Sequence, residues 1–391
     1  MTPTPRTSSA PLSVLVVSHA AGVWGAQRRL LDLAPHLAAD GIELAMACPT
    51  GELSERWREA GLPHEPLELP PHQGVRDADG HGRPGPLTLA GEVLAVARSA
   101  GAIARRARAF DLVQSHSLWA HLETALAGRI SRRPVVLDLH DIVSAGMGRR
   151  VLGLAARLAT LTLANSAATA STVAAPGKTV IVHPGVDLDR FHPGPAAPGV
   201  RAELTADPTA PLVAIIGRVD PNKGVDVLID AVAACAAGRP PHLVVIGREQ
   251  VGDPQHMEAI RRRAAERLGA RARFLPPRDD VPDVLRAVDV LVNASRHEPF
   301  GRTVLEAQAC GTPVIGTAAG GIPEFVADGE TGLLVPPFDP GAMSAALERL
   351  LGDDDLRAHL AKRGIDQART RFGLPAQASA VAMAYRRATG R

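Results

Sequence analysis

The chain has 391 residues, of which 46% are hydrophobic and only 3% aromatic, and its formal net charge is +2. This length is typical of two domains of ordinary size, and a charge so close to neutral provides no general attraction to nucleic acid. The three cysteines are scattered along the chain, which argues against a disulfide framework and fits a reducing cytoplasm.

Short β-rich runs alternate with helical patterns through the first half of the chain. The runs lie at 13–19, 43–49, 111–116, 134–140, 160–166 and 179–185, and helices are expected at 26–39, 88–109 and 119–130. This alternation predicts a parallel sheet with helices on both faces. Residues 72–86 have no periodic pattern, and we expect a mobile loop there.

Two positions in this half, Gly25 and His140, are candidates for contact with a ligand. Gly25 opens the first helix, where a missing side chain lets the backbone approach a phosphate or sugar next to the positive helix end. A G-x-G-x-x-G fingerprint is absent, which argues against a dinucleotide-dependent dehydrogenase. His140 ends the run at 134–140, and a polar residue there is expected to face a ligand.

A proline- and glycine-rich segment, 191–200, is predicted to be a linker. The strand pattern then restarts, with runs at 211–219, 242–248, 271–277, 288–295, 312–317 and 331–337. Two doubly wound domains are the simplest interpretation. Ligands bind at the carboxyl ends of such strands, so we expect the site in the cleft between the domains.

The first strand of the second half leads into the sequence GRVDPNKG at 217–224. Arg218 and Lys223 lie five residues apart in this loop. Two cations at this spacing could both reach one diphosphate through charge-assisted hydrogen bonds. The loop is therefore a candidate diphosphate clamp.

The most informative stretch is EPFGRTVLEAQACGTPVI at 298–315. Glu298 follows a buried strand, a tight turn comes next, and a helix is expected from about Gly301 to Cys310. Glu306 lies within that helix, and the helix start favours an anion. Two carboxylates on either side of an anion site suit a nucleotide sugar, which has hydroxyls at both ends and phosphate in the middle.

The spacing of Glu298 and Glu306, the Phe300-Gly301 step and the G-R-x(4)-K-G loop together resemble the signature of retaining glycosyltransferases of family GT4. The resemblance covers nearly the whole chain. It implies the GT-B fold, an α/β architecture of two doubly wound Rossmann-like domains facing each other across a cleft. The implied domains are 1–192 on the acceptor side and 193–374 on the nucleotide-sugar side, with a C-terminal helix at 375–391 packing back on the first domain.

The resemblance also assigns expected roles. His140 and Glu298 are the expected catalytic residues, His140 beside the reacting carbon and Glu298 on hydroxyls of the donor sugar. Donor-binding residues are expected at Gly25, Arg218, Lys223, Phe300, Gly301, Arg302, Thr303, Val304 and Glu306. The family usually has Gly-Gly-x-Glu where this chain has Trp24-Gly25-Ala26-Gln27, which leaves the role of Gln27 open.

The expected activity is transfer of a sugar from a UDP- or GDP-linked donor to an acceptor hydroxyl, with retention of anomeric configuration. No metal and no cofactor beyond the donor is expected, because Arg218, Lys223 and the amides near 301–304 would stabilise the leaving diphosphate. The alternatives are a nucleotide-sugar epimerase or phosphorylase on the same scaffold, and a nucleotide-sugar-binding protein without turnover.

The acceptor is expected to be a small molecule or a lipid-linked compound. Residues 98–157 hold ten arginines and four acidic residues, a net charge of +6, which allows peripheral contact with an anionic membrane. Residues 1–13 lack the apolar core of a signal peptide. We therefore expect a cytoplasmic protein that can also lie at the inner membrane face, with no nucleic-acid partner.

Overall fold

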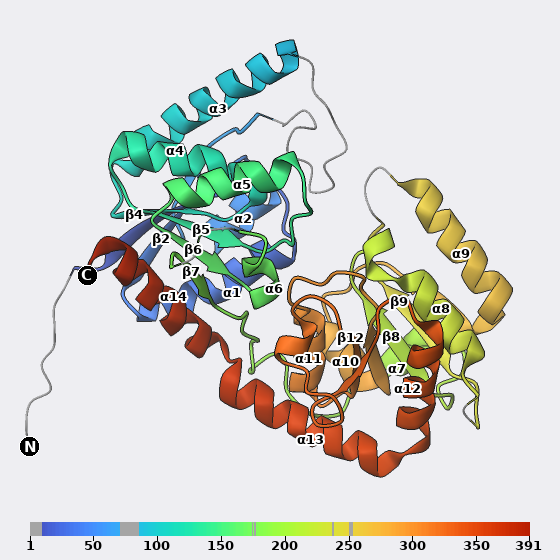
Figure 1. Ribbon diagram of the computed structural model, residues 1–391. Coiled ribbons are helices and arrows are strands. Elements are labelled where there is room, and N and C mark those ends of the chain that lie inside the picture. Colours follow the sequence, from blue (N-terminus) through green and yellow to red (C-terminus); the bar gives the residue numbers. More distant parts are fainter. Residues whose placement is uncertain (1–9, 71–85, 174, 176, 237, 250–252) are drawn as a thin grey trace, which may run out of the picture. The chain divides into compact units, whose positions relative to one another are not determined.

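The computed structural model describes residues 10–70, 86–173, 175, 177–236, 238–249 and 253–391 (Figure 1). Of the loop expected at 72–86, all but Pro86 lies outside these residues. The chain divides into two compact units. The N-terminal unit comprises Met1–Pro184 with Leu374–Arg391, and the C-terminal unit comprises Gly185–Gly373.

The N-terminal unit is built on a parallel sheet of seven strands in the order β3-β2-β1-β4-β5-β6-β7. Its strands are β1 Leu12–Val17, β2 Ile42–Cys48, β3 His64–Pro66, β4 Leu112–Ser115, β5 Val135–Leu139, β6 Leu161–Ala164 and β7 Thr179–Ile181. Its helices are α1 Gly25–Ala39, α2 Glu52–Glu59, α3 Pro86–Ala107, α4 His121–Ser131 with the preceding 3₁₀ turn Leu118–Ala120, α5 Met147–Leu158, α6 Ala167–Ala170 and α14 Leu374–Thr389.

Alternation along the strands creates an apolar layer on each face of this sheet. Val14 and Val16 of β1 point into the layer covered by α1, α2 and α14, while Leu15 and Val17 point into the layer under α3, α4 and α5. The fully buried Tyr385 belongs to the first layer. The last helix of the chain is thus part of the core of the N-terminal unit, and it lies against α1 (Figure 1).

The C-terminal unit is built on a parallel sheet of six strands in the order β10-β9-β8-β11-β12-β13. Its strands are β8 Leu212–Ile216, β9 His242–Ile246, β10 Ala272–Leu275, β11 Val290–Asn293, β12 Val314–Thr317 and β13 Leu333–Val335. Its helices are α7 Val200–Leu204, α8 Val225–Ala234, α9 Pro254–Leu268, α10 Val281–Ala287, α11 Arg302–Cys310, α12 Pro340–Gly352 and α13 Asp354–Arg371, with 3₁₀ turns at Pro221–Lys223, Gly269–Arg271 and Ile322–Glu324.

The core of the C-terminal unit repeats the same two-layer plan. Val213 and Ile215 of β8 face the layer under α8, α9 and α12, and Leu212 and Ala214 face the layer under α7, α10 and α11. In both units the carboxyl ends of the parallel strands meet at one edge of the sheet. The polar residues that follow those ends are therefore brought together.

Every strand expected from the sequence is present, and the prediction of two Rossmann-like parallel-sheet domains is confirmed. Within the described residues, one strand was missed. β3 has only three residues and ends in Pro66 at the edge of its sheet, so it has neither the length nor the apolar alternation of a recognisable strand.

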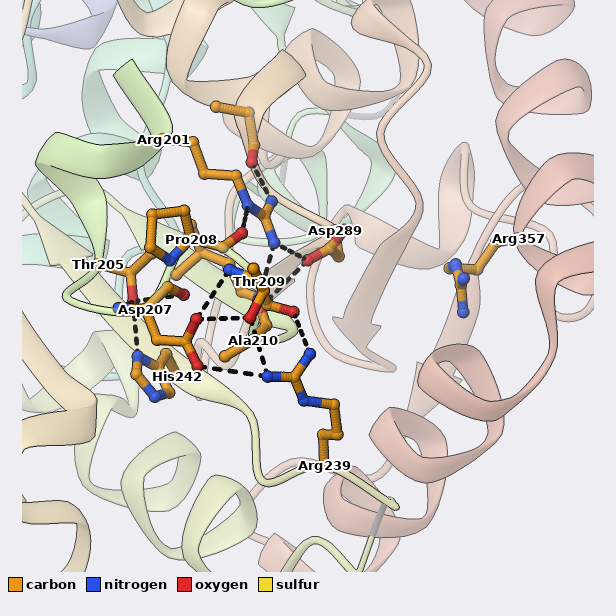
Figure 2. A network of polar contacts seen from close by, with 12 residues as sticks. Arg201, Thr205, Asp207, Pro208, Thr209, Ala210, Arg239, His242, Asp289 and Arg357 are labelled. Atoms are coloured by element: carbon orange, nitrogen blue, oxygen red, sulfur yellow. Dashed lines mark hydrogen bonds and ion pairs between the residues drawn. The ribbon is translucent and has the colours of Figure 1, made fainter. Parts of the chain in front are cut away.

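The opposite edge of the C-terminal sheet, where the strands begin, carries a network of paired charges (Figure 2). Arg201 Nη2 donates to Asp289 Oδ2 at 2.8 Å, and the same oxygen accepts from the backbone N–H of Leu212 at 2.7 Å. Arg239 pairs with Asp207 at 3.4 Å. These cations are balanced by carboxylates and anchor the segment before β8 to the sheet.

The longest helix among the described residues is α3, with 22 residues. It carries Glu92, Arg98, Arg105 and Arg106, charges that disfavour a bilayer interior. Across the described part of the chain, no helix combines the length and apolar character needed to cross a membrane.

Candidate functional site

The carboxyl edge of the N-terminal sheet holds a buried polar cluster around Asp138. This carboxylate lies in β5 and is 5% exposed. Its Oδ2 atom is 2.7 Å from Arg29 Nη2, 3.0 Å from His116 Nδ1 and 3.2 Å from His140 Nε2. Arg29 comes from the second turn of α1, His116 follows β4, and His140 follows β5. The expected catalytic histidine is therefore held from three different elements.

The charges of this cluster are set by burial and by the neighbouring cation. Burial alone would raise the pKa of Asp138, yet Arg29, together with His140 and His116, holds that pKa well below its usual value. Burial lowers the pKa of His140 to about 4, opposed by Asp138 and reinforced by Arg29. At neutral pH the cluster thus contains an ionised carboxylate, a guanidinium and a neutral His140 imidazole, which can act as a hydrogen-bond partner for a sugar.

Three residues of the cluster also have the composition of a metal site. His116, Asp138 and His140 each present one ligand atom, and these atoms lie within 4.8 Å of one another. Arg29 Nη2, however, lies 2.7 Å from Asp138 Oδ2 and 3.1 Å from His140 Nε2, two of these ligand atoms. A divalent ion would have to enter beside a guanidinium charge, and Coulomb repulsion at this separation is strongly unfavourable in a buried site. The arrangement suits Arg29 as the resident cation.

The last helix reaches the same cluster through one side chain. Tyr385 Oη of α14 donates to Gln114 Oε1, and Gln114 Nε2 donates to Asp138 Oδ2 at 3.0 Å. All three side chains are buried. Asp138, Arg29 and His116 were not singled out from the sequence, although one signal was available. An aspartate inside the otherwise apolar run VVLDL is a buried charge that requires a partner.

Gly25 and Gln27 both lie at the start of α1. Gly25 is its first helical residue, and a Cβ placed there would meet no atom within 4 Å, so the protein itself does not require glycine. Gln27 Oε1 accepts from the backbone N–H of Trp24 at 3.3 Å. Gln27 therefore caps this helix.

Asn165 lies just beyond the end of β6 and is 6% exposed. Its Nδ2 donates to the carbonyl oxygen of His140 at 3.4 Å. Its Oδ1 atom is buried and has no hydrogen-bond partner among the described residues. A buried acceptor of this kind is costly unless something donates to it, so a ligand hydroxyl at this edge would find a partner here.

The carboxyl edge of the C-terminal sheet is organised around Glu298, just beyond β11. Its Oε2 atom accepts from Lys223 Nζ at 2.7 Å, from Ser295 Oγ at 2.9 Å and from Asn293 Nδ2 at 3.1 Å. Burial alone would raise the pKa of Glu298, but Lys223 and these hydrogen bonds outweigh it, so the pKa lies below its usual value. All three of these bonds are made to Oε2.

The loop that carries Arg218 and Lys223 is shaped by Asp220, which is 3% exposed. Asp220 Oδ1 accepts from the backbone N–H groups of Asn222 at 2.9 Å and Lys223 at 3.1 Å, and its Oδ2 accepts from Arg218 Nε at 2.8 Å. Only Nε of Arg218 is used in this pair, and its side chain is 57% exposed. Lys223 donates to Glu298 and has two further ammonium donors. Both cations thus keep hydrogen-bonding capacity for a phosphate.

Two glycines allow loops to press against the segment that carries Glu298. At Gly224, with φ of 64°, a Cβ would lie 2.1 Å from the carbonyl oxygen of Ala294. At Gly320, with φ of 62°, a Cβ would lie 2.0 Å from the carbonyl oxygen of Glu298, and Gly321 N–H donates to that oxygen at 2.8 Å. Any side chain at either position would displace the backbone that positions Glu298.

The start of α11 lies directly after Glu298. Gly301 is its N-cap, in the left-handed region with φ of 99°, and has no side chain to cap the helix. Arg302 Nη2 donates to Glu306 Oε1 at 3.3 Å, four residues further along the helix. Thr303 is the second residue of the helix. The positive helix end and a half-buried carboxylate one turn away are thus next to the Glu298 turn.

The side chains of Phe300 and Val304 belong to the core. Phe300 is 2% exposed and its ring stacks on that of Phe325, with 4.6 Å between ring centroids. Val304 is completely buried, and its N–H donates to the carbonyl oxygen of Gly301 at 3.0 Å. The side chains of these two expected donor-binding residues therefore serve the core of the unit.

Sequence profiles of two families match the chain. The family described as glycosyl transferases group 1 matches residues 199–367, and Glycosyltransferase Family 4 matches residues 23–190. A D-inositol 3-phosphate glycosyltransferase of Streptomyces avermitilis is 33% identical over 392 aligned positions, which cover 91% of this chain and 81% of the relative. A relative with the same name from Streptomyces scabiei is also 33% identical, over 91% of this chain and 84% of the relative.

Solved structures share the fold. HepE of Anabaena, crystallised with UDP and glucose, is 25% identical with a TM-score of 0.80, covering 95% of this chain and 98% of HepE. Sucrose-phosphate synthase of Thermosynechococcus elongatus, at 22% identity and a TM-score of 0.78, covers 96% of this chain and 98% of that one. The second likeness concerns the fold alone.

The buried histidines predict a pH-dependent stability. Burial lowers the pKa of His140 to about 4 and that of His121 to about 3, against 6.5 for an ordinary histidine. Below pH 6.5 the unfolded chain therefore binds protons that the folded chain does not, and the free energy of unfolding falls as the pH falls. Each such histidine contributes a slope of up to about 1.4 kcal/mol per pH unit. Urea unfolding of wild type and His140→Gln between pH 7 and 4.5 should show a shallower slope in the variant.

The exposed His359 provides the matched control for this experiment. His359→Gln should retain the wild-type slope because this side chain is 50% exposed. A His140→Gln variant with the wild-type slope would contradict a buried, neutral His140.

The Lys223–Glu298 pair predicts a second effect on stability. Lys223→Met leaves the Glu298 carboxylate buried without its cation, and the free energy of unfolding should fall by about 2 kcal/mol, below the full cost for a buried pair because Lys223 is 24% exposed. The pKa of Glu298 should rise in the variant, so the loss should shrink as the pH is lowered. Denaturant unfolding at several pH values measures both effects. The double variant Lys223→Met/Glu298→Gln should recover part of the loss, and equal losses in the single and double variants would contradict the coupling.

Proposed function

Because this chain belongs to the glycosyl transferases of group 1, the GT4 type with the GT-B fold, we propose that it transfers a sugar from a nucleoside-diphosphate sugar to an acceptor hydroxyl with retention of configuration. The observation that carries this proposal is the C-terminal unit's edge. Glu298, held ionised by Lys223, lies beside the start of α11 and one loop from Arg218. This arrangement offers cations to a diphosphate and a carboxylate oxygen to sugar hydroxyls.

In this proposal the basic residues bind the diphosphate and the carboxylates bind hydroxyl groups. Arg218 and Lys223 would hold the diphosphate and stabilise its growing negative charge, helped by the main chain near 301–304. Glu298 would accept hydrogen bonds from hydroxyls of the donor sugar, and Glu306 from the ribose. Gly25 would give the donor access to the start of α1, and His140 would contact the sugar near its anomeric carbon. We propose that these groups suffice without a divalent metal.

Retention requires that the acceptor attack from the face that the diphosphate leaves. Among the described site residues, Asp138 is paired with Arg29 and Glu298 accepts hydrogen bonds from Lys223, Asn293 and Ser295, so neither carboxylate is a free nucleophile. We therefore propose a front-face substitution. The bond from the anomeric carbon to the diphosphate oxygen breaks, the acceptor oxygen bonds to that carbon, and the leaving phosphate takes the acceptor's proton.

The relatives narrow the choice of substrates. HepE of Anabaena was crystallised with UDP and glucose, which supports a UDP-linked hexose as the donor, ahead of a GDP-linked one. The Streptomyces relatives are named for D-inositol 3-phosphate, which supports a phosphorylated polyol among the candidate acceptors. The relatives and structures compared give no support to an epimerase, a phosphorylase or a non-catalytic nucleotide-sugar-binding protein.

We also propose that the basic segment 98–157 contacts anionic membranes peripherally, in a protein that works in the cytoplasm. What supports this is the outer face of α5, where Met147 is 50% and Leu154 is 48% exposed and Arg150 and Arg157 are exposed beside them. Flotation with phosphatidylglycerol vesicles at low salt checks the proposal, and Arg150→Glu/Arg157→Glu should stay unbound. Absence of wild-type binding would contradict it.

The activity itself is tested by turnover. The purified chain, UDP-glucose and D-inositol 3-phosphate should yield a glucoside with the donor's α configuration, read from the anomeric coupling constant by NMR. Turnover should be unchanged in EDTA. Turnover that is lost in EDTA and restored by Mg²⁺ or Mn²⁺ would contradict metal independence. A β-linked product would contradict retention. Conversion of UDP-glucose without any acceptor would point to the epimerase alternative.

A matched pair of variants separates donor binding from general effects. Glu306→Gln should weaken UDP binding in calorimetry at least tenfold, since a hydrogen bond to a charged group contributes about 1.5–3 kcal/mol. Glu266→Gln, at an exposed position of α9, should bind UDP as wild type does. Unchanged UDP affinity in Glu306→Gln would remove the ribose role from that residue.

A further inference from the structure

A cavity of about 540 Å³ opens at the edge of the N-terminal sheet where β5, β6 and β7 begin. This is the edge opposite to His140. Apolar side chains, Ala125 and Leu158 among them, form part of its lining. Its other side chains include four cations, Arg129, Arg132, Arg133 and Lys178, and no carboxylate lines it.

Two of these cations already have partners in the backbone. Lys178 Nζ donates to the carbonyl oxygens of Arg157 at 3.1 Å and Ala159 at 3.0 Å, at the end of α5, and Arg133 Nη2 donates to that of Arg108 at 2.8 Å. These contacts are ordinary capping of helix ends. They explain why two of the four residues are basic without any ligand.

The other two, Arg129 and Arg132, are exposed and are not engaged in this way. Neither Arg129 nor Arg132 forms a side-chain hydrogen bond or an ion pair within the part of the chain that the structure describes. Arg132 also lies in the left-handed region, with φ of 56°, as one other non-glycine residue does in the described part of the chain. Two guanidinium groups beside two further cations repel one another, and an anion would relieve that repulsion.

Three arginines near the starts of other strands are each paired with a carboxylate. In the C-terminal unit Arg201 and Arg239 are matched by Asp289 and Asp207 (Figure 2). At the start of β4, Arg391 is matched by Asp111 at 2.8 Å. Arg129 and Arg132 in the cavity at β5–β7 thus differ from these three arginines, each of which is paired with a carboxylate.

We propose that this cavity binds a small organic phosphate, free in solution or as the headgroup of a lipid. Guanidinium groups bind phosphate oxygens through paired, charge-assisted hydrogen bonds. The volume lies within the range of about 300–1,000 Å³ that small-molecule sites occupy, and exceeds what inorganic phosphate fills. The apolar lining, which includes Leu158, provides a surface for the carbon part of the ligand.

This site is separate from the proposed transfer site. β5 runs from Val135 at the cavity to Leu139, next to His140, which at about 3.3 Å per residue places roughly 16 Å of strand between them. A ligand here would not compete with the donor. The proposal does not rest on the transfer reaction, and its test makes no use of turnover.

Site-resolved chemical labelling of the wild-type chain tests the proposal. Phenylglyoxal modifies accessible arginines, and mass spectrometry reads each peptide separately. Glucose 6-phosphate should slow modification of Arg129 and Arg132 at least fivefold, whereas sulfate at equal ionic strength should not. The exposed Arg262 and Arg349, which lie outside the cavity, should be labelled at the same rate in all samples.

A second arm distinguishes the two sources of the phosphate. Phosphatidylcholine vesicles containing phosphatidylinositol 4-phosphate should protect the same two arginines if a lipid headgroup is the ligand. Protection by glucose 6-phosphate alone assigns a free ligand, and protection by these vesicles alone assigns the headgroup. Protection by neither, or equal protection by phosphatidylserine vesicles, would overturn the proposal, because surface charge alone would then explain the contact.

Calorimetry with variants adds an independent measurement. Arg129→Ala/Arg132→Ala should weaken binding of whichever probe protects at least tenfold. Arg262→Ala/Arg349→Ala removes the same charge from exposed positions and should stay within twofold of wild type. Equal affinities for the two double variants would overturn the assignment to this cavity.

Discussion

Each unit of this protein depends on a carboxylate that is kept ionised although it is buried at the carboxyl edge of a parallel sheet. Asp138 is held by Arg29 and Glu298 by Lys223, at 2.7 Å in both cases. Burial of a lone carboxylate would raise its pKa and remove its charge, so the cation is required for the acid to be useful. Once paired, the carboxylate becomes a fixed acceptor around which other polar side chains are arranged. Glu298, for example, accepts hydrogen bonds from Asn293 and Ser295.

The pairing also changes how the cations of the C-terminal unit should be understood. From sequence alone, Lys223 is a free phosphate ligand, whereas in the structure one of its donors is already used by Glu298. Arg218 is likewise oriented by Asp220, which at the same time caps the turn that carries Lys223. Both cations are therefore pre-organised before any ligand binds. Because these two side chains are oriented before binding, the entropic cost of binding a flexible diphosphate is lower.

The fold and the main motifs could be predicted because strands leave a strong local signal. Apolar runs such as VDVLVNAS mark buried parallel strands, and the glycine and acid spacing after 298 marks a turn into a helix. What could not be predicted is how residues far apart in sequence meet. The contact of Arg29 with Asp138 spans 109 positions, and that of Lys223 with Glu298 spans 75. Local pattern also could not separate Phe300, a core residue by its side chain, from its neighbours in the same motif.

The C-terminal helix shows why the two units are not simply consecutive halves of the chain. Residues 374–391 are separated from the rest of the N-terminal unit by the whole C-terminal unit, yet Tyr385 completes the polar chain through Gln114 to Asp138. A buried phenol needs a partner, and Gln114 is committed at its other end to the same carboxylate as His140. Loss of this helix would therefore expose an apolar face of the sheet and also leave Gln114 Oε1 without its donor. The last residues of the chain thus help to fix the position of the histidine expected to contact the sugar, 245 positions before Tyr385 in the sequence.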